Sequence, residues 1–510
     1  MLAKILSGAN IGLESVLVTI EVDIASQGLP SFTIVGLADR AVEESKERVR
    51  SAIRNIGADF PSKRITVNLA PADLPKEGPL FDLPIALGIL VASGQIPLSQ
   101  RIDLEKSLII GELSLDGGLR STHGVLPLVI AAKGLNLSKV IIPKDNIQEA
   151  SVIGGIEILA PESLGQVVKM ILGQEEIAPV VFEEIDLQKD LKFEYDFSQI
   201  KGQEQAKRAL EVAAAGGHNI LLKGSPGAGK TLLARSFPSI LPPLSMEEAI
   251  EITKIYSVSG NLQNGKHFIA SRPFRSPHHS ASHVGLIGGG NNIKPGEITL
   301  AHRGVLFLDE IAEFPRQALE ALRQPLEDNL ITISRASGSL TFPAKFILLA
   351  AQNPCPCGFL GDVKKNCSCM PGQIAKYKRK ISGPLLDRID IYLEVPAVEV
   401  EKLTENLEAE KSDDIRVRVI KARQIQGERF KGKILTNSEM SNEDIKKYCV
   451  ITNEGLDLLK IAISSLSLSA RGYHRVLKLS RTIADLESSE NIAVEHVAEA
   501  LQYRSREEGA

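Results

Sequence analysis

The chain contains Gly224-Ser225-Pro226-Gly227-Ala228-Gly229-Lys230-Thr231, which matches the phosphate-binding pattern G-x-x-x-x-G-K-[ST]. The apolar run His218–Leu222 precedes this stretch and is expected to form a strand. Glycines let backbone N–H groups close around phosphates, Lys230 can reach the β- and γ-phosphates, and the Thr231 hydroxyl can ligate Mg²⁺. The stretch therefore predicts a site for ATP and Mg²⁺ in an α/β domain, although it does not by itself name the reaction.

A second apolar run delivers two adjacent carboxylates, in the order Gly304-Val305-Leu306-Phe307-Leu308-Asp309-Glu310. We expect Asp309 to hold the Mg²⁺ shell and Glu310 to orient or deprotonate the attacking water, which is a hydrolase arrangement rather than a kinase one. The alternative is a buried strand that ends in an acidic turn. The phosphate-binding stretch upstream makes that alternative the weaker one, because both segments suit a single α/β domain.

Three further polar residues are expected near the nucleotide. Asn353 follows the apolar run Lys345–Ala351 and can sense the γ-phosphate from the tip of a strand. Arg388 lies in the proline-led segment Gly383–Asp390 and can stabilise transition-state charge in a neighbouring subunit. Arg471 opens a helical pattern and faces whatever that helix packs against.

Four of the five cysteines fall within fifteen positions, at Cys355, Cys357, Cys367 and Cys369. Four thiolates can close a tetrahedral Zn²⁺ site of the structural kind. The spacing is C-x-C rather than the commoner C-x₂-C, so unliganded cysteines stay the alternative. Cys449 stands apart and is expected to pack against a helix.

The order of these elements resembles that of the AAA+ ATPases, and the closer likeness is to their magnesium-chelatase-like branch, specifically the ComM (YifB) family. The residues that carry it are Arg272-Pro273-Phe274-Arg275-Ser276-Pro277-His278-His279, the run Gly288–Gly290 leading to Pro295-Gly296-Glu297-Ile298, and Gln352-Asn353-Pro354-Cys355-Pro356-Cys357-Gly358. The resemblance covers nearly the whole chain. It implies that Arg471 is the second sensor arginine.

The resemblance also bears on the segment Leu330–Phe342, whose two β-type runs predict a hairpin with Arg335 near its tip. In rings of this branch the hairpin points into the pore, which implies that Arg335 contacts DNA. The alternative is a surface hairpin with an exposed arginine. Three nearby histidines lack the spacing of a metal site and are interpreted as part of a polar loop near the ring surface, with no role assigned: His278, His279 and His283.

The family likeness implies a ring-forming motor, with a hexamer as the expected assembly, that couples ATP hydrolysis to movement along single-stranded or branched DNA. Branch migration in recombination or natural transformation is the expected task, with other recombination proteins as candidate partners. One alternative is a chelatase-type motor that remodels a partner protein, although such a subunit would require neither the N-terminal domain nor the cysteines. The other alternative is an ATP-dependent protease.

The N-terminal part resembles the Lon-type peptidase fold through Pro75-Lys76-Glu77-Gly78-Pro79 and Gly111–Gly117. A Ser/Lys peptidase needs a hydroxyl nucleophile and an amine that accepts its proton. Leu80 and Leu126 stand where the serine and the lysine would fall, so we expect a scaffold or partner-docking module without peptidase activity. A divergent active site stays the alternative because a few hydroxyl and amine side chains lie nearby: Ser114, Ser121 and Lys133.

The 510 residues are too many for one core, and 43 % of them are hydrophobic. From Val16 to Leu172 short β-type runs alternate with helical ones, including an amphipathic helix over Arg40–Asn55. The predicted order begins with a degenerate Lon-protease-like α/β domain over 1–172 and an acidic linker over 173–196. An α/β AAA+ core that contains the cysteines follows over 197–396, and then a polar linker over 397–414 and a helical lid over 415–510.

Net charge restricts the kind of DNA contact that the chain can make, and hydropathy restricts where in the cell the protein is expected. A net charge of −4 argues against a protein covered in basic surface, so any DNA contact is expected to be local, as in the lumen of a ring. No apolar run approaches the roughly 18 residues of a membrane span, and Met1–Asn10 lacks the core of a signal peptide. We therefore expect a cytoplasmic protein without a membrane partner.

Overall fold

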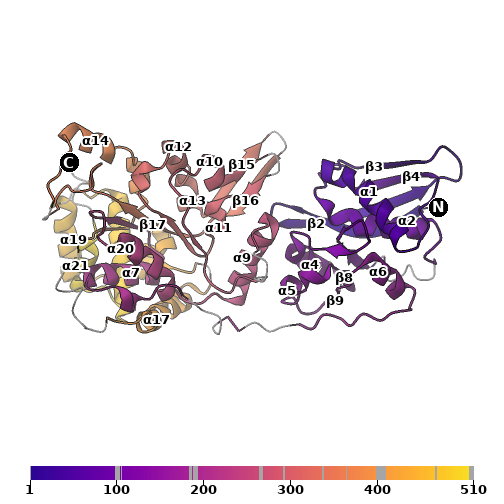
Figure 1. Ribbon diagram of the computed structural model, residues 1–510. Coiled ribbons are helices and arrows are strands. Elements are labelled where there is room, and N and C mark those ends of the chain that lie inside the picture. Colours follow the sequence, from indigo (N-terminus) through magenta and orange to yellow (C-terminus); the bar gives the residue numbers. More distant parts are fainter. Residues whose placement is uncertain are drawn as a thin grey trace. The chain divides into compact units, whose positions relative to one another are not determined.

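The computed structural model describes residues 2–97, 104, 106–182, 186–187, 193–262, 268–290, 293–335, 338–362, 365–397, 409–432, 434–465 and 468–504. These form two compact units (Figure 1). Unit 1 comprises Met1–Asp186 and Met246–Ile269, and unit 2 comprises Leu187–Ser245 and Ala270–Ala510. Within the described part of the chain, no helix has the length and hydropathy to cross a membrane.

Unit 1 begins with a four-stranded sheet in the order β1 (Leu2–Ile11), β2 (Glu14–Ile24), β4 (Arg64–Ala70) and β3 (Ser31–Val35). The strands are antiparallel except for β3 and β4. Helix α1 (Arg40–Asn55) follows β3, and the Asp39 carboxylate caps it by accepting from the backbone N–H of Val42. Helix α2 (Asp82–Ala92) is buried along its whole length and packs on β1 and β2.

A second, parallel sheet completes unit 1, in the order β5 (Ser107–Ile109), β8 (Lys139–Ile141) and β9 (Glu157–Leu159). Its helices are α4 (Val125–Gly134), α5 (Ile147–Ala150) and α6 (Leu164–Ile171), and a short strand pair is formed by β6 (Glu112–Leu113) and β7 (Leu119–Arg120). The predicted alternation of short strands with helices between Val16 and Leu172 is thereby confirmed, and so is the predicted helix over Arg40–Asn55. The strand β1 has no counterpart among the sequence-based predictions.

Helix α9 (Met246–Ser259) also belongs to unit 1, where it packs on α4 (Figure 1). The backbone N–H of Gly124 donates to the carbonyl of Ser257 at 3.2 Å, and the Ser257 hydroxyl donates to Glu149. Ile250 and Phe268 pack against the unit 1 core. A segment from inside the predicted 197–396 core thus joins the N-terminal unit by its contacts, and the predicted domain boundaries remain predictions.

Unit 2 is built on a five-stranded parallel sheet in the order β11 (Phe274–Arg275), β14 (Val305–Leu308), β17 (Ile347–Gln352), β10 (Ile220–Lys223) and β18 (Ile391–Glu394). Every residue of β14 and β17 is buried, which explains why these strands are continuous apolar runs in the sequence. Helices α7 (Glu204–Gly216) and α8 (Lys230–Ser236) flank β10 along the chain. The predicted α/β class is confirmed.

The remaining elements of unit 2 before the lid are short. They are α10 (His283–Ile287), β12 (Gly288–Gly289), β13 (Lys294–Pro295), α11 (Glu297–Leu300), α12 (Arg316–Glu320), α13 (Arg323–Asp328), β15 (Leu330–Arg335), β16 (Gly338–Pro343), α14 (Pro371–Lys378) and α15 (Gly383–Leu386). The antiparallel pair β15 and β16 is the predicted hairpin, with Arg335 opposite Gly338. The Arg335 side chain and residues 336–337 lie outside the described set.

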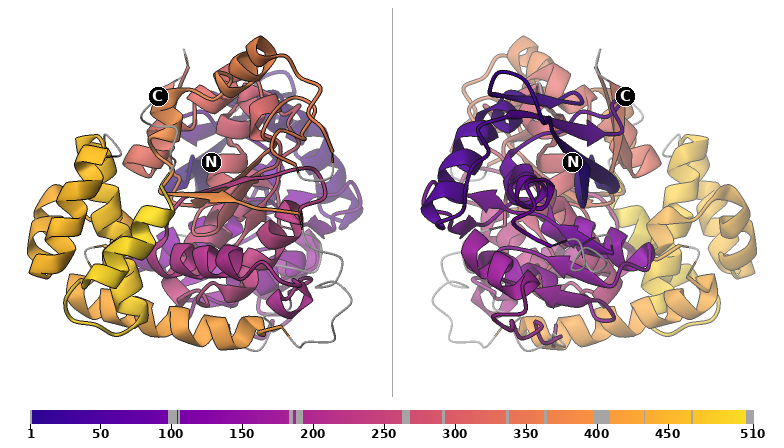
Figure 2. Two further views of the ribbon diagram at one scale, coloured as in Figure 1. Left: turned by 90° about the vertical axis from the view of Figure 1, so that its left-hand side faces the viewer. Right: turned by 90° about the vertical axis from the view of Figure 1, so that its right-hand side faces the viewer.

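Five helices form the predicted lid: α17 (Ser412–Phe430), α18 (Asn442–Tyr448), α19 (Asn453–Ser465), α20 (Ala470–Leu486) and α21 (Val494–Gln502). Figure 2 shows them in orange and yellow as one group. Helix α17 begins at Ser412, three residues before the predicted 415. The Ser412 side chain is buried and accepts from the backbone N–H of Phe197 at 2.8 Å. Residues 398–408 of the predicted second linker lie outside the described set. Lid and sheet share one apolar core.

Candidate functional site

The site lies at the carboxyl ends of three neighbouring strands of the unit 2 sheet. The phosphate-binding stretch follows β10, the two carboxylates follow β14, and Asn353 follows β17. In register, Lys223 pairs with Gln352, and Leu308 pairs with Ala350. Because the strands are parallel, their carboxyl ends meet at one edge, where open α/β sheets bind ligands.

The backbone of the phosphate-binding loop has room only for glycine at its first position. A Cβ atom on Gly224 would lie 2.3 Å from the carbonyl oxygen of Val395. Gly229 has φ +87°, which glycine adopts at little cost and which directs the chain into α8. The loop is held to the neighbouring strand because the backbone N–H of Gly224 donates to the carbonyl of Gln352 at 3.2 Å.

The predicted lysine and the predicted sensor asparagine are in contact. The ammonium of Lys230 donates to Asn353 Oδ1 at 3.2 Å and to the carbonyls of Gly224 and Ser225 at 2.7 Å and 3.0 Å. Burial lowers the pKa of Lys230, while the charges of Asp309 and Glu310 oppose that shift. The cation is therefore positioned by the loop itself, in a partly desolvated place where it interacts strongly with anions.

The predicted metal ligands also meet. The Thr231 hydroxyl donates to Asp309 Oδ2 at 3.0 Å, so a hydroxyl oxygen and a carboxylate oxygen are side by side at the start of α8. Oxygen ligands of this kind suit Mg²⁺, which binds proteins through few such groups and keeps waters and phosphate oxygens as its other ligands. The residues present therefore fit a nucleotide-bound Mg²⁺.

Glu310 has an unusual backbone, with φ +51° in the left-handed region. Its N–H donates to Asp309 Oδ1 at 3.0 Å, and its carbonyl accepts from Glu313 at 2.7 Å. Its carboxylate lies 3.9 Å from Nδ1 of His279. The His279 ring packs on His278, with centroids 4.0 Å apart.

Sequence reasoning left these histidines without a role and did not place His279 beside Glu310. The signal was the position of His278 and His279, three and four residues after the end of β11, a strand that pairs with β14 through Arg275 and Leu306. A residue after β11 is therefore delivered to the same sheet edge as the carboxylates. His283 begins α10 and takes part in none of the contacts described above.

The two predicted arginines lie elsewhere in unit 2. Arg388 donates from Nη1 to the carbonyl of Pro384 at 2.7 Å, pairs through Nη2 with Glu327, and has a side chain that is only 15 % exposed. Arg471 follows the N-cap Ser469, is 64 % exposed, and lies 3.8 Å from Asp387. In the described contacts neither guanidinium reaches the phosphate-binding loop, so a role in trans stays a prediction for Arg388.

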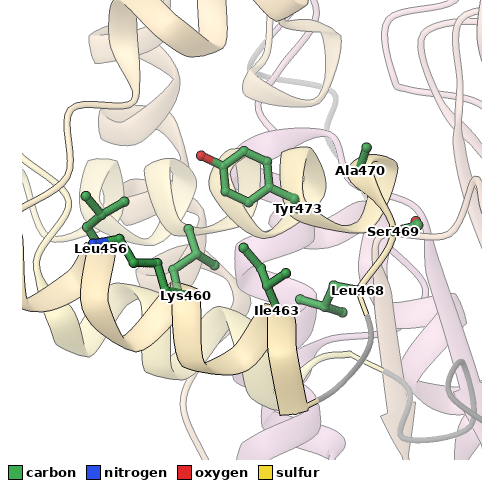
Figure 3. A pocket seen from close by; sticks show the side chains of 8 residues that line it. Leu456, Lys460, Ile463, Leu468, Ser469, Ala470 and Tyr473 are labelled. Atoms are coloured by element: carbon green, nitrogen blue, oxygen red, sulfur yellow. The ribbon is translucent and has the colours of Figure 1, made fainter.

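A cavity of about 410 Å³ opens beside the start of α20 (Figure 3). Its lining is mostly apolar and comes from α19 and α20 with the loop between them: Leu456, Leu459, Lys460, Ile463, Leu468, Ser469, Ala470 and Tyr473. One lysine among apolar side chains does not make a phosphate site. The nucleotide site is better assigned to the strand ends.

The four cysteines converge as predicted, with all Sγ atoms within 4.8 Å of one another. The Sγ distances are 3.4 Å from Cys355 to Cys357 and 3.6 Å from Cys367 to each of these two. A tetrahedron with Zn–S bonds of about 2.3 Å has sulfur atoms about 3.8 Å apart. The cluster can therefore bind a metal ion such as zinc.

The thiols differ in their environments. Donation by the backbone N–H groups of Phe359 and Ser368 lowers the pKa of Cys357 to about 6, which favours the thiolate that metals bind. Burial and hydrogen bonds with the neighbouring thiols raise the pKa of Cys367, and they raise that of Cys369 to about 12. Cys449, by contrast, is buried against α20, where it donates to the carbonyl of Leu477 at 3.8 Å. Burial raises its pKa to about 12, so it is an inert packing residue, as expected.

In unit 1 the two positions matched to a peptidase pair are part of the core. Leu80 is 9 % exposed and Leu126 is fully buried. The Asp82 carboxylate nearby is also buried, and Arg48 donates to it at 2.6 Å and 3.0 Å. Burial raises the pKa of Asp82 to about 6 despite that guanidinium. Apolar packing and a structural ion pair thus occupy the region.

Models of the magnesium chelatase subunit ChlI match most of the chain. One described as magnesium chelatase, subunit ChlI, matches residues 196–403, one described as subunit ChlI of Mg-chelatase matches 20–146, and one for the ChlI C-terminal part matches 409–504. The three matches cover both units. The first contains the phosphate-binding stretch, Asp309, Glu310, Asn353, Arg388 and the four clustered cysteines, and the third contains Arg471.

Individual relatives are similar over the whole chain. Competence protein ComM of Haemophilus influenzae is 46 % identical over 507 residues, which are 99 % of this chain and 97 % of that protein. The Escherichia coli protein YifB is 42 % identical over 500 residues, or 98 % and 96 % of the two chains. Lon protease 2 of Bacillus subtilis is 31 % identical over 172 residues, or 31 % of this chain and 30 % of that protein, which fits a Lon-like N-terminal unit.

Proposed function

Because the chain belongs to the ComM and YifB family of magnesium-chelatase-like AAA+ proteins, we propose that it is an ATP-driven, ring-forming motor that moves DNA. ATP and Mg²⁺ fit this family of ATPases. The observation that carries the proposal is the convergence of Lys230, Asn353, Thr231 and Asp309 from three adjacent strand ends. That arrangement is suited to binding and cleaving a nucleoside triphosphate.

Each residue has a proposed part in hydrolysis. The Lys230 ammonium binds the β- and γ-phosphates, and Asn353 reports the state of the γ-phosphate by its contact with that ammonium. Thr231 and Asp309 hold Mg²⁺, which when bound neutralises charge on the phosphates. Glu310 orients the attacking water and accepts its proton. Its position directly after Asp309, at the carboxyl end of β14, supports this role.

We propose that the subunits assemble into a ring, with six as the expected number. Arg388 then acts on the nucleotide of a neighbour, and Arg471 acts as the second sensor at the start of α20. In the single subunit Arg388 is paired with Glu327, so the trans role requires this ion pair to open on assembly. The Glu327 carboxylate is 56 % exposed, so water can solvate it when the pair opens.

The DNA contact is assigned to the hairpin of β15 and β16. Arg335 ends β15 opposite Gly338, at the turn of the hairpin. The relative from Haemophilus influenzae is named a competence protein, and competence is the capacity to take up DNA, which supports a DNA substrate. Branch migration during recombination or natural transformation is the proposed task. The N-terminal unit is proposed to be a docking module, and the cytoplasm the location.

A second candidate is a motor that remodels a metal-inserting partner protein. The matching family models are named for a magnesium chelatase subunit, which favours this candidate. The two candidates share the ATP site and differ in the substrate. Stimulation of hydrolysis by DNA therefore separates them.

The test compares Arg335→Ala with Arg316→Ala, which removes an exposed arginine from α12 and so makes the same change in charge. Arg335→Ala should leave hydrolysis without DNA unchanged, abolish its stimulation by DNA, and lower the slope of log affinity against log salt by about one. Arg316→Ala should do none of this. Equal behaviour of the two variants would remove the hairpin from the proposal, and a lack of stimulation in the unsubstituted chain would favour the remodelling motor.

A further inference from the structure

The loop that carries the four cysteines rests directly against the phosphate-binding loop. Gly358 follows Cys357 and has φ +85°, and a Cβ atom there would lie 2.6 Å from both Cγ and Cδ of Pro226. The backbone of Gly358 therefore touches the proline ring. The N–H of Gly358 also donates to the carbonyl of Cys355 at 3.0 Å, which fixes the point of contact to the first cysteine.

A second connection runs through Asn353. This residue lies two positions before Cys355, and its side chain accepts from the Lys230 ammonium at 3.2 Å. Tyr377 of α14, which is 4 % exposed, forms a hydrogen bond with the backbone of Asn353. Helix α14 begins two residues after Cys369, so both ends of the cysteine loop are attached to the residue that contacts Lys230.

From these two contacts we propose that the cysteine cluster positions the phosphate-binding loop, so that a metal ion on the four thiolates and a nucleoside triphosphate bind cooperatively. The inference rests on the proposed ATP site and on thiolate metal binding. A metal bound by Cys355, Cys357, Cys367 and Cys369 joins the two cysteine-bearing segments of the loop to each other. Gly358 is then held in contact with Pro226, and Asn353 in contact with Lys230.

Without the metal, the nucleotide must order the cysteine loop as well as bind, and its affinity falls. Coupling between two sites is reciprocal, so the nucleotide must in turn slow the loss of the metal. Couplings of this kind are usually about 5–150-fold. We expect a change of about tenfold in either direction, because two contacts rather than a shared ligand connect the sites.

The chain offers a matched pair of glycines for the test. Gly358 and Gly361 lie in the same cysteine loop with φ of +85° and +81°, so alanine strains the backbone similarly at both. At Gly361 no atom of the described residues beyond its chain neighbours lies within 4 Å of the added Cβ, whereas at Gly358 the added Cβ meets Pro226. Gly358→Ala therefore disturbs the contact with the phosphate-binding loop, and Gly361→Ala controls for strain alone.

The experiment uses the full chain loaded with zinc and measures the rate of zinc transfer to a zinc-selective chromophoric chelator. It is run with and without a non-hydrolysable ATP analogue and Mg²⁺. The analogue should slow zinc loss about tenfold in the unsubstituted chain and in Gly361→Ala, and less than about threefold in Gly358→Ala. Affinity for the analogue should fall in Gly358→Ala relative to the unsubstituted chain. In a chain that already carries Pro226→Ala, adding Gly358→Ala should cost less affinity, because the proline ring that the new Cβ meets is gone.

Zinc content and nucleotide affinity, measured separately on the same samples, distinguish the possible failures. Zinc loss that is insensitive to the bound analogue overturns the inference and leaves the proposed ATPase intact. A chain that holds zinc but binds no nucleotide overturns the proposed function as well. Equal responses of Gly358→Ala and Gly361→Ala would show that the contact with Pro226 does not transmit the coupling, which also overturns the inference.

Discussion

Asp390 attaches the lid to the sheet, and its surroundings determine how much free energy of unfolding is lost when its charge is removed. Its carboxylate accepts from the backbone N–H of Asn219 at 3.1 Å and lies 3.4 Å from His218 Nδ1 and 3.5 Å from Arg475 of α20. His218 Nε2 in turn lies 2.8 Å from the Thr482 hydroxyl on α20. One buried carboxylate therefore connects the starts of β10 and β18 to the lid.

The size of the effect comes from the pKa of Asp390. Burial alone raises that pKa, but the hydrogen bond with His218 and the charges of His218 and Arg475 lower it from 3.8 to about 2. Since one pKa unit is worth about 1.4 kcal/mol, the ionised carboxylate stabilises the fold by about 2 kcal/mol. A carboxyl group whose pKa is lowered on folding stabilises the fold above its unfolded pKa, so this contribution is complete above about pH 5 and is lost as the pH falls through the folded pKa of about 2.

Asp390→Asn should therefore lower the free energy of unfolding of unit 2 by about 2 kcal/mol in urea at pH 7, and by the same amount at pH 5.5. The control is Asp457→Asn, which breaks an exposed pair with Lys460 and should cost less than about 0.5 kcal/mol. If Asp390→Asn is as mild as the control, the reasoning is refuted. A deficit that disappears at pH 5.5 would refute it too, because the Asp390 carboxylate is fully ionised at both pH values.

Three other outcomes are expected. Lys230→Ala should abolish ATP binding, whereas Glu310→Gln should bind ATP and fail to hydrolyse it. Filter binding and phosphate release distinguish the two variants, and equal loss of ATP binding in both would contradict the assigned roles. Arg388→Ala subunits mixed into unsubstituted rings should lower activity more than their share of the mixture, and a strictly proportional loss would argue against action in trans. The full chain with ATP should not cleave an unfolded protein, because Leu80 and Leu126 supply neither nucleophile nor base; cleavage that persists in Glu310→Gln would mean a divergent active site.

Much of the fold could be predicted because local signals agree with the final packing. Helix α1 has the predicted bounds, since the Asp39 cap and an amphipathic pattern both specify it. The strands β14 and β17 are apolar on both faces and lie within two residues of their predicted positions. The convergence of the four thiols followed from their spacing alone.

The missing parts depend on tertiary contacts that leave no periodic trace. Helix α2 is buried on every side and therefore shows no amphipathic pattern. The assignment of α9 to unit 1 is decided by contacts such as that of Ser257 with Glu149, far apart in the sequence. The proximity of His279 to Glu310, and of Gly358 to Pro226, likewise required the sheet register and the loop backbone to be known.

Movement of a DNA branch driven by ATP tests the central claim most directly. A labelled synthetic four-way junction, incubated with the full chain, ATP and Mg²⁺, should be converted into duplex products, and Glu310→Gln should leave the junction intact while still binding ATP. Hydrolysis should be faster with the junction than without DNA. Hydrolysis at one rate with and without DNA, together with intact junctions, would contradict a motor that acts on DNA and would favour one that remodels a partner protein.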